Sequence, residues 1–423
     1  MEGWKDFGLV FSDEAMVFVQ KREAALLSTY KRMEDTALYN QGKVFSAFSQ
    51  LGIGAGNLFG STGYGYDDRG RELLEQLFAL SLGAEDALVR PHIASGTHAI
   101  YMTLRGLLRP GDTLYYITGR PYDTLYKAIG IVPEDGSLMD YGIDYKEEAL
   151  VDGLHLNWER ICHALEEDKS IKVVAVQRSR GYGDRAPIMI GEMAEIFGKV
   201  RAIRPDVKIF VDNCYGEFCE KKEPTGVGAH VMAGSLIKNP GGGIAPTGGY
   251  IVGEKESIQR IEGALTVPGV GREIGSYENS YRPYYQGLFL APSVVLNALK
   301  TATLFGSCFS ELGYEVSPLP FDVRGDIIQA ITFGNREDLL LFCQMIQRHS
   351  PIDAMAVPIP WEMPGYVDEV VMAAGTFVGG ASIELSADGP MREPYTAYLQ
   401  GGLTYEHGKL CCIAAVDAMM KKG

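Results

Sequence analysis

The spacing of hydrophobic residues changes along the chain. Between about residues 87 and 252, short apolar runs alternate with segments in which apolar residues recur every three or four positions. The first pattern predicts buried strands and the second predicts amphipathic helices. The predicted strands are Ala87–Val89, Thr113–Thr118, Lys172–Val176, Lys208–Asp212, Val231–Ser235 and Gly249–Val252, with helices such as Arg71–Leu82 and Glu192–Ile203 between them. This alternation favours an α/β fold built on a largely parallel sheet.

The two ends of the chain follow another pattern. Helix-like segments over Asp13–Val19 and Ala24–Met33 precede a glycine-rich stretch at 52–70. Ala291–Leu312 has apolar residues at helical spacing and predicts one long helix. The segments predicted after it are strands at Asp326–Phe333, Val370–Met372 and Ser382–Leu385, and helices at Glu337–Gln347 and Lys409–Met420. We therefore expect an N-terminal helical segment (1–60), a large α/β domain (61–290) and a linking helix with a small C-terminal α+β domain (291–423).

Composition and charge exclude several classes of protein. The 423 residues are 46% hydrophobic and 22% charged, as is typical of a soluble globular protein. A net charge of −15 disfavours binding to nucleic acid, which needs a basic surface. No signal peptide is visible and no apolar run approaches the roughly 20 residues that span a bilayer. We expect a cytoplasmic protein with no membrane or nucleic-acid partner. The seven histidines and seven cysteines lack the spacing of metal ligands, so no metal site is expected.

The first candidate for chemistry is a helix start. In Ser95-Gly96-Thr97-His98-Ala99-Ile100, small residues follow a predicted strand and begin an amphipathic helix. Such a start leaves backbone N–H groups free at the positive end of the helix dipole, which suits a phosphate. The alternative is an ordinary serine cap.

Two charged residues follow later strands. Asp212 ends the strand Lys208–Asp212, where open α/β sheets bind ligands, although an aspartate there can also cap the next element. Lys238 follows the strand Val231–Ser235 and precedes a run of glycines. Most lysines are solvated, but one sheltered at a strand end can lose its proton and form a Schiff base.

Together, these three features match the needs of pyridoxal phosphate. The helix start holds the phosphate, the aspartate keeps the pyridine nitrogen protonated, and the lysine forms the Schiff base. The motifs GYGYDD, VRPHIASGTHAI, QRSRGY, VDNCYGEF, GSLIKNPGG and IELSADGPMREPY resemble those of the methionine γ-lyase family, also described as aluminium-resistance or cystathionine β-lyase-like proteins. The resemblance extends from about residue 63 to the C-terminus and implies a fold-type I pyridoxal-phosphate enzyme.

The resemblance also implies roles for individual residues. Lys238 is the lysine that binds the cofactor, and Asp212 is the partner of its ring nitrogen. Gly96, Thr97 and Ser235 hold the phosphate. Tyr122, in GRPYDTL, stacks on the cofactor ring and is a candidate proton donor in the reaction.

Three further residues are implied for the substrate and for a partner subunit. Arg392, in GPMREPY, grips the α-carboxylate of the amino-acid substrate through a bidentate contact. Tyr64 or Tyr66 reaches the phosphate in a neighbouring chain, because enzymes of this family share their active sites between subunits. We therefore expect a homodimer or a homotetramer.

The chain departs from the well-studied γ-lyases at several positions. It lacks their Tyr-x-Arg pair, has Ile237 before the lysine where they have a hydroxyl, and has Gln177-Arg178-Ser179-Arg180 in place of an asparagine-containing loop. We expect a carbon–sulfur lyase that acts on methionine, cystathionine or cysteine. Two alternatives stay open: an aminotransferase or another chemistry at the α-proton, and a non-catalytic binding protein with the same fold.

Overall fold

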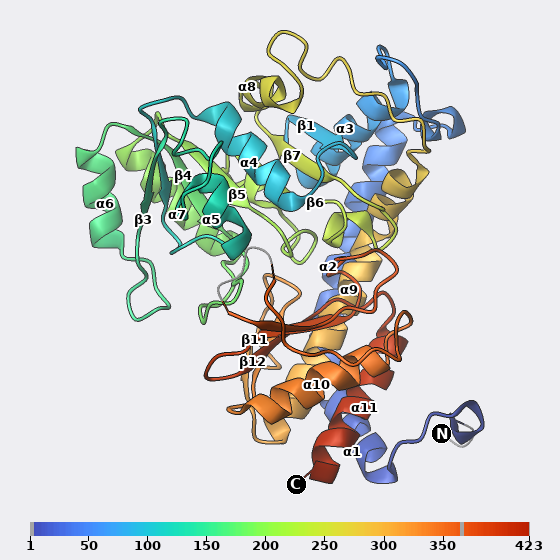
Figure 1. Cartoon of the computed structure of the whole chain (residues 1–423). Helices are drawn as coiled ribbons and strands as arrows, with labels where there is room; N and C mark the ends of the chain where they lie inside the picture. Colours follow the sequence, from blue (N-terminus) through green and yellow to red (C-terminus); the bar gives the residue numbers. More distant parts are fainter. Residues whose placement is uncertain (1–3, 364–367, 423) are drawn as a thin grey trace. The chain divides into compact units, whose positions relative to one another are not determined.

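The computed structural model describes residues 4–363 and 368–422, which divide into two compact units (Figure 1). One unit, the large unit, consists of residues 37–293, and the other, the small unit, combines residues 1–36 with 294–423. The N-terminal segment is divided at residue 36, inside a helix that continues to Leu51. The domain boundaries predicted at residues 60 and 290 stay a prediction.

The large unit is built on a seven-stranded sheet. Its strands are β1 (Asp86–Arg90), β2 (Thr113–Tyr116), β3 (Asp144–Glu147), β4 (Ile171–Gln177), β5 (Lys208–Asp212), β6 (Val231–Ser235) and β7 (Gly249–Gly253). Their order across the sheet is β1-β7-β6-β5-β4-β2-β3, and only β7 runs antiparallel to its neighbours. The predicted α/β fold with a mostly parallel sheet is confirmed. The hydrophobic pattern missed β3, because its sequence DYKE is polar and lies at the sheet edge.

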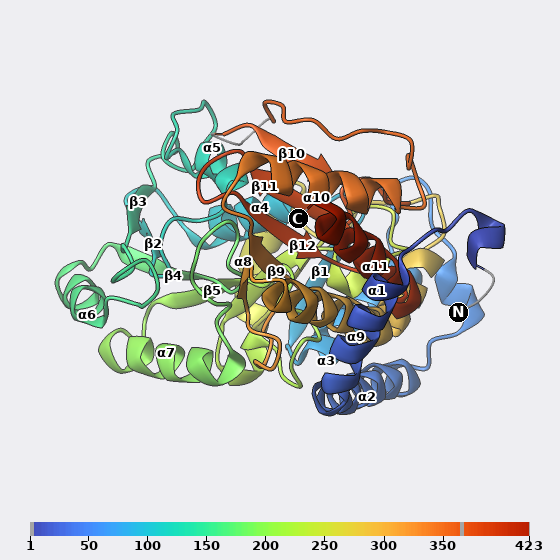
Figure 2. The ribbon, with the colours of Figure 1, turned by 90° about the horizontal axis from the view of Figure 1, so that it is seen from below.

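Helices cover both faces of this sheet. They are α3 (Arg69–Leu82), α4 (Gly96–Leu107), α5 (Tyr126–Ile129), α6 (Trp158–Glu167), α7 (Ile190–Ile203) and α8 (Lys255–Leu265). Figure 2 shows α4 and α5 on one face and α3 and α7 on the other. Ile100 of α4 shares a buried cluster with Ile251 of β7, whereas the neighbouring Tyr250 packs against Phe78 of α3. Burial on both faces explains why the strands have continuous apolar runs.

The small unit contains a five-stranded antiparallel sheet in the order β10-β11-β12-β9-β8. Its elements are α1 (Asp13–Ala25), β8 (Glu315–Ser317), β9 (Gln329–Thr332), α10 (Arg336–Arg348), β10 (Val370–Ala373), β11 (Ser386–Pro390), β12 (Thr396–Gln400) and α11 (Tyr405–Lys422). The strand predicted at Ser382–Leu385 is wrong, because Glu384 there accepts hydrogen bonds from two backbone amides and holds a turn. The strand begins at Ser386, and its polar sequence SADGP hid it.

Two long helices each contribute residues to both units: α2 (Leu27–Leu51) and α9 (Arg282–Glu311). Helix α9 begins earlier than predicted and continues through Pro292, a residue that usually marks a helix boundary. Within the described ranges, α9 is the one helix long and apolar enough to cross a membrane. However, 67% of its most apolar stretch is buried inside the structure, as in the core helix of a globular protein.

Candidate active site

Three parallel strands end at the same edge of the large sheet. Gln177, the last residue of β4, lies opposite Asp212, the last residue of β5, and Asp212 lies opposite Ala233 of β6. Ser235 ends β6 two residues further on, and Lys238 follows it. The carboxyl ends of parallel strands are where open α/β sheets bind ligands. The strand order therefore brings together the aspartate and the lysine that the sequence singled out.

The start of α4 adjoins this edge. An ideal Cβ placed on Gly96 would lie 3.2 Å from the Cβ of Ser235 and 3.3 Å from the Sγ of Cys214. Ser95 caps the helix by accepting a hydrogen bond from the amide of His98 at 3.1 Å. Within residues 4–363 and 368–422, no hydrogen bond uses the amides of Gly96 and Thr97. These donors are available at the positive end of the helix, directly beside β6.

His98 has a local structural role at this helix start. Its Nδ1 accepts a hydrogen bond from the amide of Ala94 at 3.1 Å. Burial lowers the pKa of the imidazole and favours the neutral form that accepts this bond. His98 thus fixes the turn that leads into α4.

Lys238 and Asp212 influence each other electrostatically. Burial raises the pKa of Asp212, and the nearby Lys238 charge opposes that rise. Burial alone would lower the pKa of Lys238, but Cys214, Tyr215 and Asp212 outweigh it and raise the pKa of the amine. The Lys238 Nζ lies 4.0 Å from the centroid of the Tyr215 ring. In this state the lysine is an ammonium group in contact with an aromatic face and near a carboxyl group.

Tyr122 lies next to the end of β4. It precedes a short 3₁₀ turn, Asp123–Leu125, and Thr124 in that turn is hydrogen-bonded to Thr97, with their Oγ1 atoms 3.0 Å apart. An ideal Cβ on Gly181 would lie 3.2 Å from the Gln177 Nε2 and 3.3 Å from the Tyr122 Cδ2. Tyr122 and Thr97 are therefore at the same edge of the sheet as Asp212.

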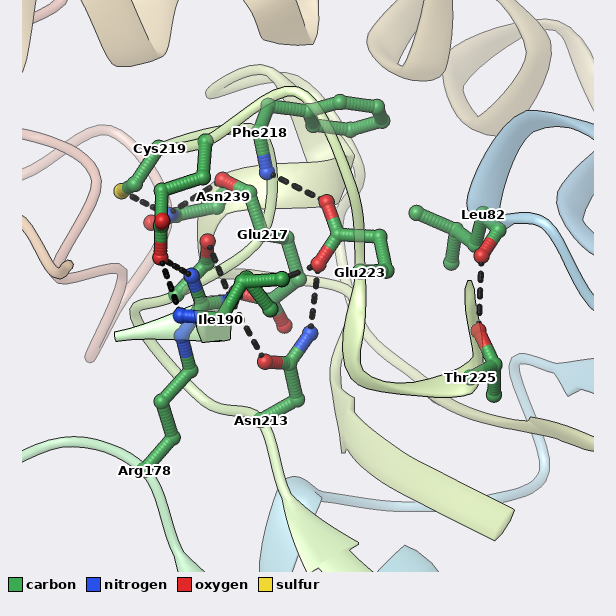
Figure 3. A network of polar contacts seen from close by, with 12 residues as sticks. Leu82, Arg178, Ile190, Asn213, Glu217, Phe218, Cys219, Glu223, Thr225 and Asn239 are labelled. Carbon is green, nitrogen blue, oxygen red and sulfur yellow. Dashed lines mark hydrogen bonds and ion pairs between the residues drawn. The ribbon is translucent and has the colours of Figure 1, made fainter. Parts of the chain in front are cut away.

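Arg178 belongs to a buried network of polar side chains (Figure 3). Its guanidinium donates hydrogen bonds of 2.9 Å to the Asn213 Oδ1, the Gly216 carbonyl and the Glu220 Oε2, and lies 3.4 Å from the Glu223 Oε2. The side chains of Arg178 and Glu223 are completely buried. The network holds the loop 213–223, which follows Asp212.

Two residues of that loop were missed by the sequence interpretation. Tyr215 contacts Lys238, and Glu217 is a fully buried carboxyl group whose Oε1 accepts a 2.6 Å hydrogen bond from the Tyr250 hydroxyl. Burial raises the pKa of Glu217 to about 8. The sequence VDNCYGEF contains both residues, but no spacing rule shows that one faces the lysine and the other is buried beside β7.

Tyr64, Tyr66 and Arg392 are not among the residues at the carboxyl ends of β4, β5 and β6. Tyr64 and Tyr66 are 70% and 62% exposed, and their ring centroids are 5.6 Å apart. The Arg71 guanidinium anchors their segment by donating to the carbonyl of Gly65 at 2.9 Å. Arg392 belongs to the small unit, where its exposed guanidinium forms a 2.7 Å ion pair with Asp368.

The residues at the sheet edge fit pyridoxal phosphate. The amides at the start of α4 and the Ser235 hydroxyl are donors of the kind that hold a phosphate, and the absence of a side chain at Gly96 keeps the space between them open. The Oε1 of Gln177, beside Asp212, is buried and has no hydrogen-bond partner among the described residues. A carboxyl group for a ring nitrogen and an amine for an aldehyde complete the set.

The chain is similar to known proteins in both sequence and structure. The family described as methionine gamma-lyase matches residues 15–420. The uncharacterized protein YnbB of Bacillus subtilis is 47% identical over 402 residues, which are 95% of each chain. A carbon–sulfur lyase involved in aluminium resistance from Clostridium novyi NT is 45% identical, with a TM-score of 0.95 over 99% of both chains. The pyridoxal-phosphate-dependent protein YhfS of Escherichia coli, 16% identical with a TM-score of 0.61 over 92% of this chain and 97% of its own, shares the fold.

Proposed function

The chain belongs to the methionine gamma-lyase family, and on that premise we propose that it is a pyridoxal-phosphate-dependent carbon–sulfur lyase acting on a sulfur-containing L-amino acid. The observation that carries the proposal is the meeting of Lys238, Asp212 and the start of α4 at one sheet edge. The relative from Clostridium novyi is described as a carbon–sulfur lyase, which supports the same reaction class.

Each residue of the edge has a defined task in this proposal. When bound, pyridoxal phosphate supplies a conjugated ring that takes up electrons from the substrate's α-carbon. Asp212 holds a proton at the ring nitrogen, and the amides of Gly96 and Thr97, with the Ser235 hydroxyl, bind the phosphate. The Lys238 amine would accept the proton from the α-carbon of the substrate. Tyr122 would hold the ring by stacking and would donate a proton to the sulfur leaving group.

Two further parts of the proposal concern the substrate carboxylate and a second subunit. Arg392 binds the carboxylate, and the guanidinium can exchange its exposed partner Asp368 for the substrate. Tyr64 and Tyr66 are held outward on an anchored segment, a placement suited to contact with another copy of the chain. We propose a homodimer or homotetramer in which these tyrosines complete the neighbour's phosphate site.

The test of reaction type is the balance of products. Incubation with methionine, cystathionine or cysteine, without added keto acid, should give keto acid, ammonia and the sulfur product in equal amounts. A lyase regenerates the aldehyde form of its cofactor in every turnover, so no acceptor is needed. If keto acid forms without free ammonia and turnover stops until a keto-acid acceptor is added, the enzyme is an aminotransferase and the lyase proposal is wrong.

The cofactor and the shared site have separate tests. Borohydride treatment of the yellow holoenzyme should leave a pyridoxyl group on Lys238, located by mass spectrometry; an adduct on another lysine would overturn the assignment. For the shared site, Lys238→Ala chains mixed with Tyr64→Phe/Tyr66→Phe chains should regain activity through hybrid sites. Hybrid oligomers that form but stay inactive would contradict the role of the tyrosines.

A further inference from the structure

Tyr215 has an unusual position for a residue without an assigned role. It lies three residues after Asp212, in the left-handed backbone region with φ at +74°. A residue with a side chain adopts this conformation at a cost, and such strain concentrates at functional sites. The Tyr215 ring faces the Nζ of Lys238 at 4.0 Å from the centroid, and its hydroxyl forms a hydrogen bond with the same amine. The strained conformation therefore places an aromatic face against the amine proposed to move the proton.

The surrounding structure holds Tyr215 in this place. Asn239, the residue after Lys238, donates from its Nδ2 to the carbonyls of Tyr215 and Glu217, each at 3.0 Å. The buried Arg178 guanidinium donates a hydrogen bond to the carbonyl of Gly216 at 2.9 Å. The loop is thus tied on one side to the chain that carries the lysine and on the other side to the end of β4.

The groups that face Lys238 differ in the charge they can carry near neutral pH. They are Asp212 at the end of β5 and Cys214, Tyr215 and Glu217 in the following loop. Burial raises the pKa of the Cys214 thiol, so it is neutral, and Glu217 is neutral below about pH 8. Asp212 is then the one charged group of this set, and in the proposed function it would hold the ring nitrogen of the cofactor. The ring of Tyr215 is an uncharged contact of the amine, with its centroid 4.0 Å from the Nζ.

We infer that Tyr215 sets the proton affinity of the Lys238 amine and the direction in which it points, with Asn239 as the residue that positions the tyrosine. The inference rests on the proposed function, in which Lys238 exchanges the proton of the α-carbon. An aromatic face attracts a cation and not a neutral amine, and the hydroxyl oxygen accepts a bond from the ammonium N–H. Both contacts make Lys238 a stronger base for the proton it takes up.

The test measures the amine itself and does not depend on turnover. Full-length protein freed of cofactor is treated with trace acetic anhydride between pH 6 and 11, and the acetylation of each lysine is followed by mass spectrometry. Only the neutral amine reacts, so the rate at a fixed pH reports the proton affinity of Lys238. At pH 8, Tyr215→Leu should make Lys238 react about fivefold faster, because a cation–π contact of this kind is worth about 1 kcal/mol. Tyr215→Phe, which keeps the ring face, should give a smaller increase of about twofold.

Two further variants separate this role from general loss of structure. Asn239→Leu should increase the Lys238 rate, and in combination with Tyr215→Leu it should add nothing further, because both act through the same ring. Tyr39→Leu removes a surface ring that lies 5.5 Å from the Nζ of Lys221, and it should leave the Lys238 rate unchanged. A Lys238 rate unchanged in both Tyr215→Leu and Tyr215→Phe would overturn the inference. A wild-type protein without lyase activity would instead contradict the proposed function and leave this measurement intact.

Discussion

The buried carboxyl group of Glu217 predicts how the stability of the fold depends on pH. Glu217 is completely buried, and burial raises its pKa from the ordinary 4.5 to about 8. Between these two values the folded protein keeps a proton that the unfolded chain releases. The free energy of unfolding therefore falls as pH rises through this range. The contribution is fully present below pH 4.5 and is lost by about pH 8.

The size of this change in the free energy of unfolding follows from the pKa shift of Glu217. Each tenfold difference in proton affinity is worth about 1.4 kcal/mol. Ionisation of Glu217 in the unfolded chain therefore lowers the free energy of unfolding by about 3 kcal/mol at pH 7 and about 4 kcal/mol at pH 8. Glu217→Gln keeps the size of the side chain and an oxygen to accept the bond from Tyr250, but it cannot ionise. The variant should be close to wild type in stability at pH 5 and more stable by several kcal/mol at pH 8.

Urea unfolding at half-unit steps from pH 5 to 9 measures this difference. The gap between Glu217→Gln and wild type should widen by about 1.4 kcal/mol for each pH unit and become constant above pH 8. Glu195→Gln, at an exposed position of α7, is the control and should leave the pH profile unchanged. A gap that is the same at every pH would show that Glu217 ionises in the fold as it does in water, and would refute the reasoning.

Three other substitutions test the helix start, the buried network around Arg178 and the carboxylate contact of Arg392. Gly96→Ala places a Cβ 3.2 Å from the Ser235 Cβ, and should weaken cofactor binding about tenfold by titration, as expected from a crowded contact worth 1–3 kcal/mol; unchanged affinity would mean that the helix start does not hold the phosphate. Arg178→Met removes the guanidinium paired with the buried Glu223 and should lower the free energy of unfolding in urea by about 3–5 kcal/mol; a loss below about 1 kcal/mol would contradict the network's role. Arg392→Lys keeps the charge but loses the two-pronged contact, and should raise KM by an amount worth about 2 kcal/mol with little change in kcat; an unchanged KM would exclude Arg392 from carboxylate binding.

The sequence predicts the sheet well because its strands are buried on both faces. The predicted bounds of Lys208–Asp212 and Val231–Ser235 are those of β5 and β6. Each of these short strands has an apolar stretch and ends in a polar residue, so the position of Asp212 at the strand end follows from the pattern. The strand at Ser386–Pro390 could not be found in this way, because its SADGP sequence has no apolar run and its place in the sheet depends on pairing with β10 and β12.

Some parts of the candidate site could likewise be predicted from local sequence, and others could not. The helix start at Ser95 and the aspartate at 212 depend on local sequence, and both are where the pattern predicts them. The loop after Asp212 depends on contacts from distant parts of the chain. Arg178 reaches it from the end of β4, and Asn239 reaches it from beyond β6. No pattern within VDNCYGEF contains that information, so the contact between Tyr215 and Lys238 required the structure.

The residues proposed to bind the cofactor and the loop that contacts Lys238 are separate parts of the site. In the proposed function, the helix start and Asp212 serve the phosphate and the ring nitrogen of the cofactor, which are the same whatever the substrate. The loop 213–223 contacts Lys238, the group proposed to exchange the proton, and its conformation needs left-handed backbone at both Tyr215 and Phe218. Each such residue costs about 1–3 kcal/mol, and the carboxylates around Arg178 with the two bonds from Asn239 supply contacts that offset this cost. We therefore expect a change in that network to alter the proton affinity of Lys238 and to leave the proposed cofactor contacts at α4 and β5 the same.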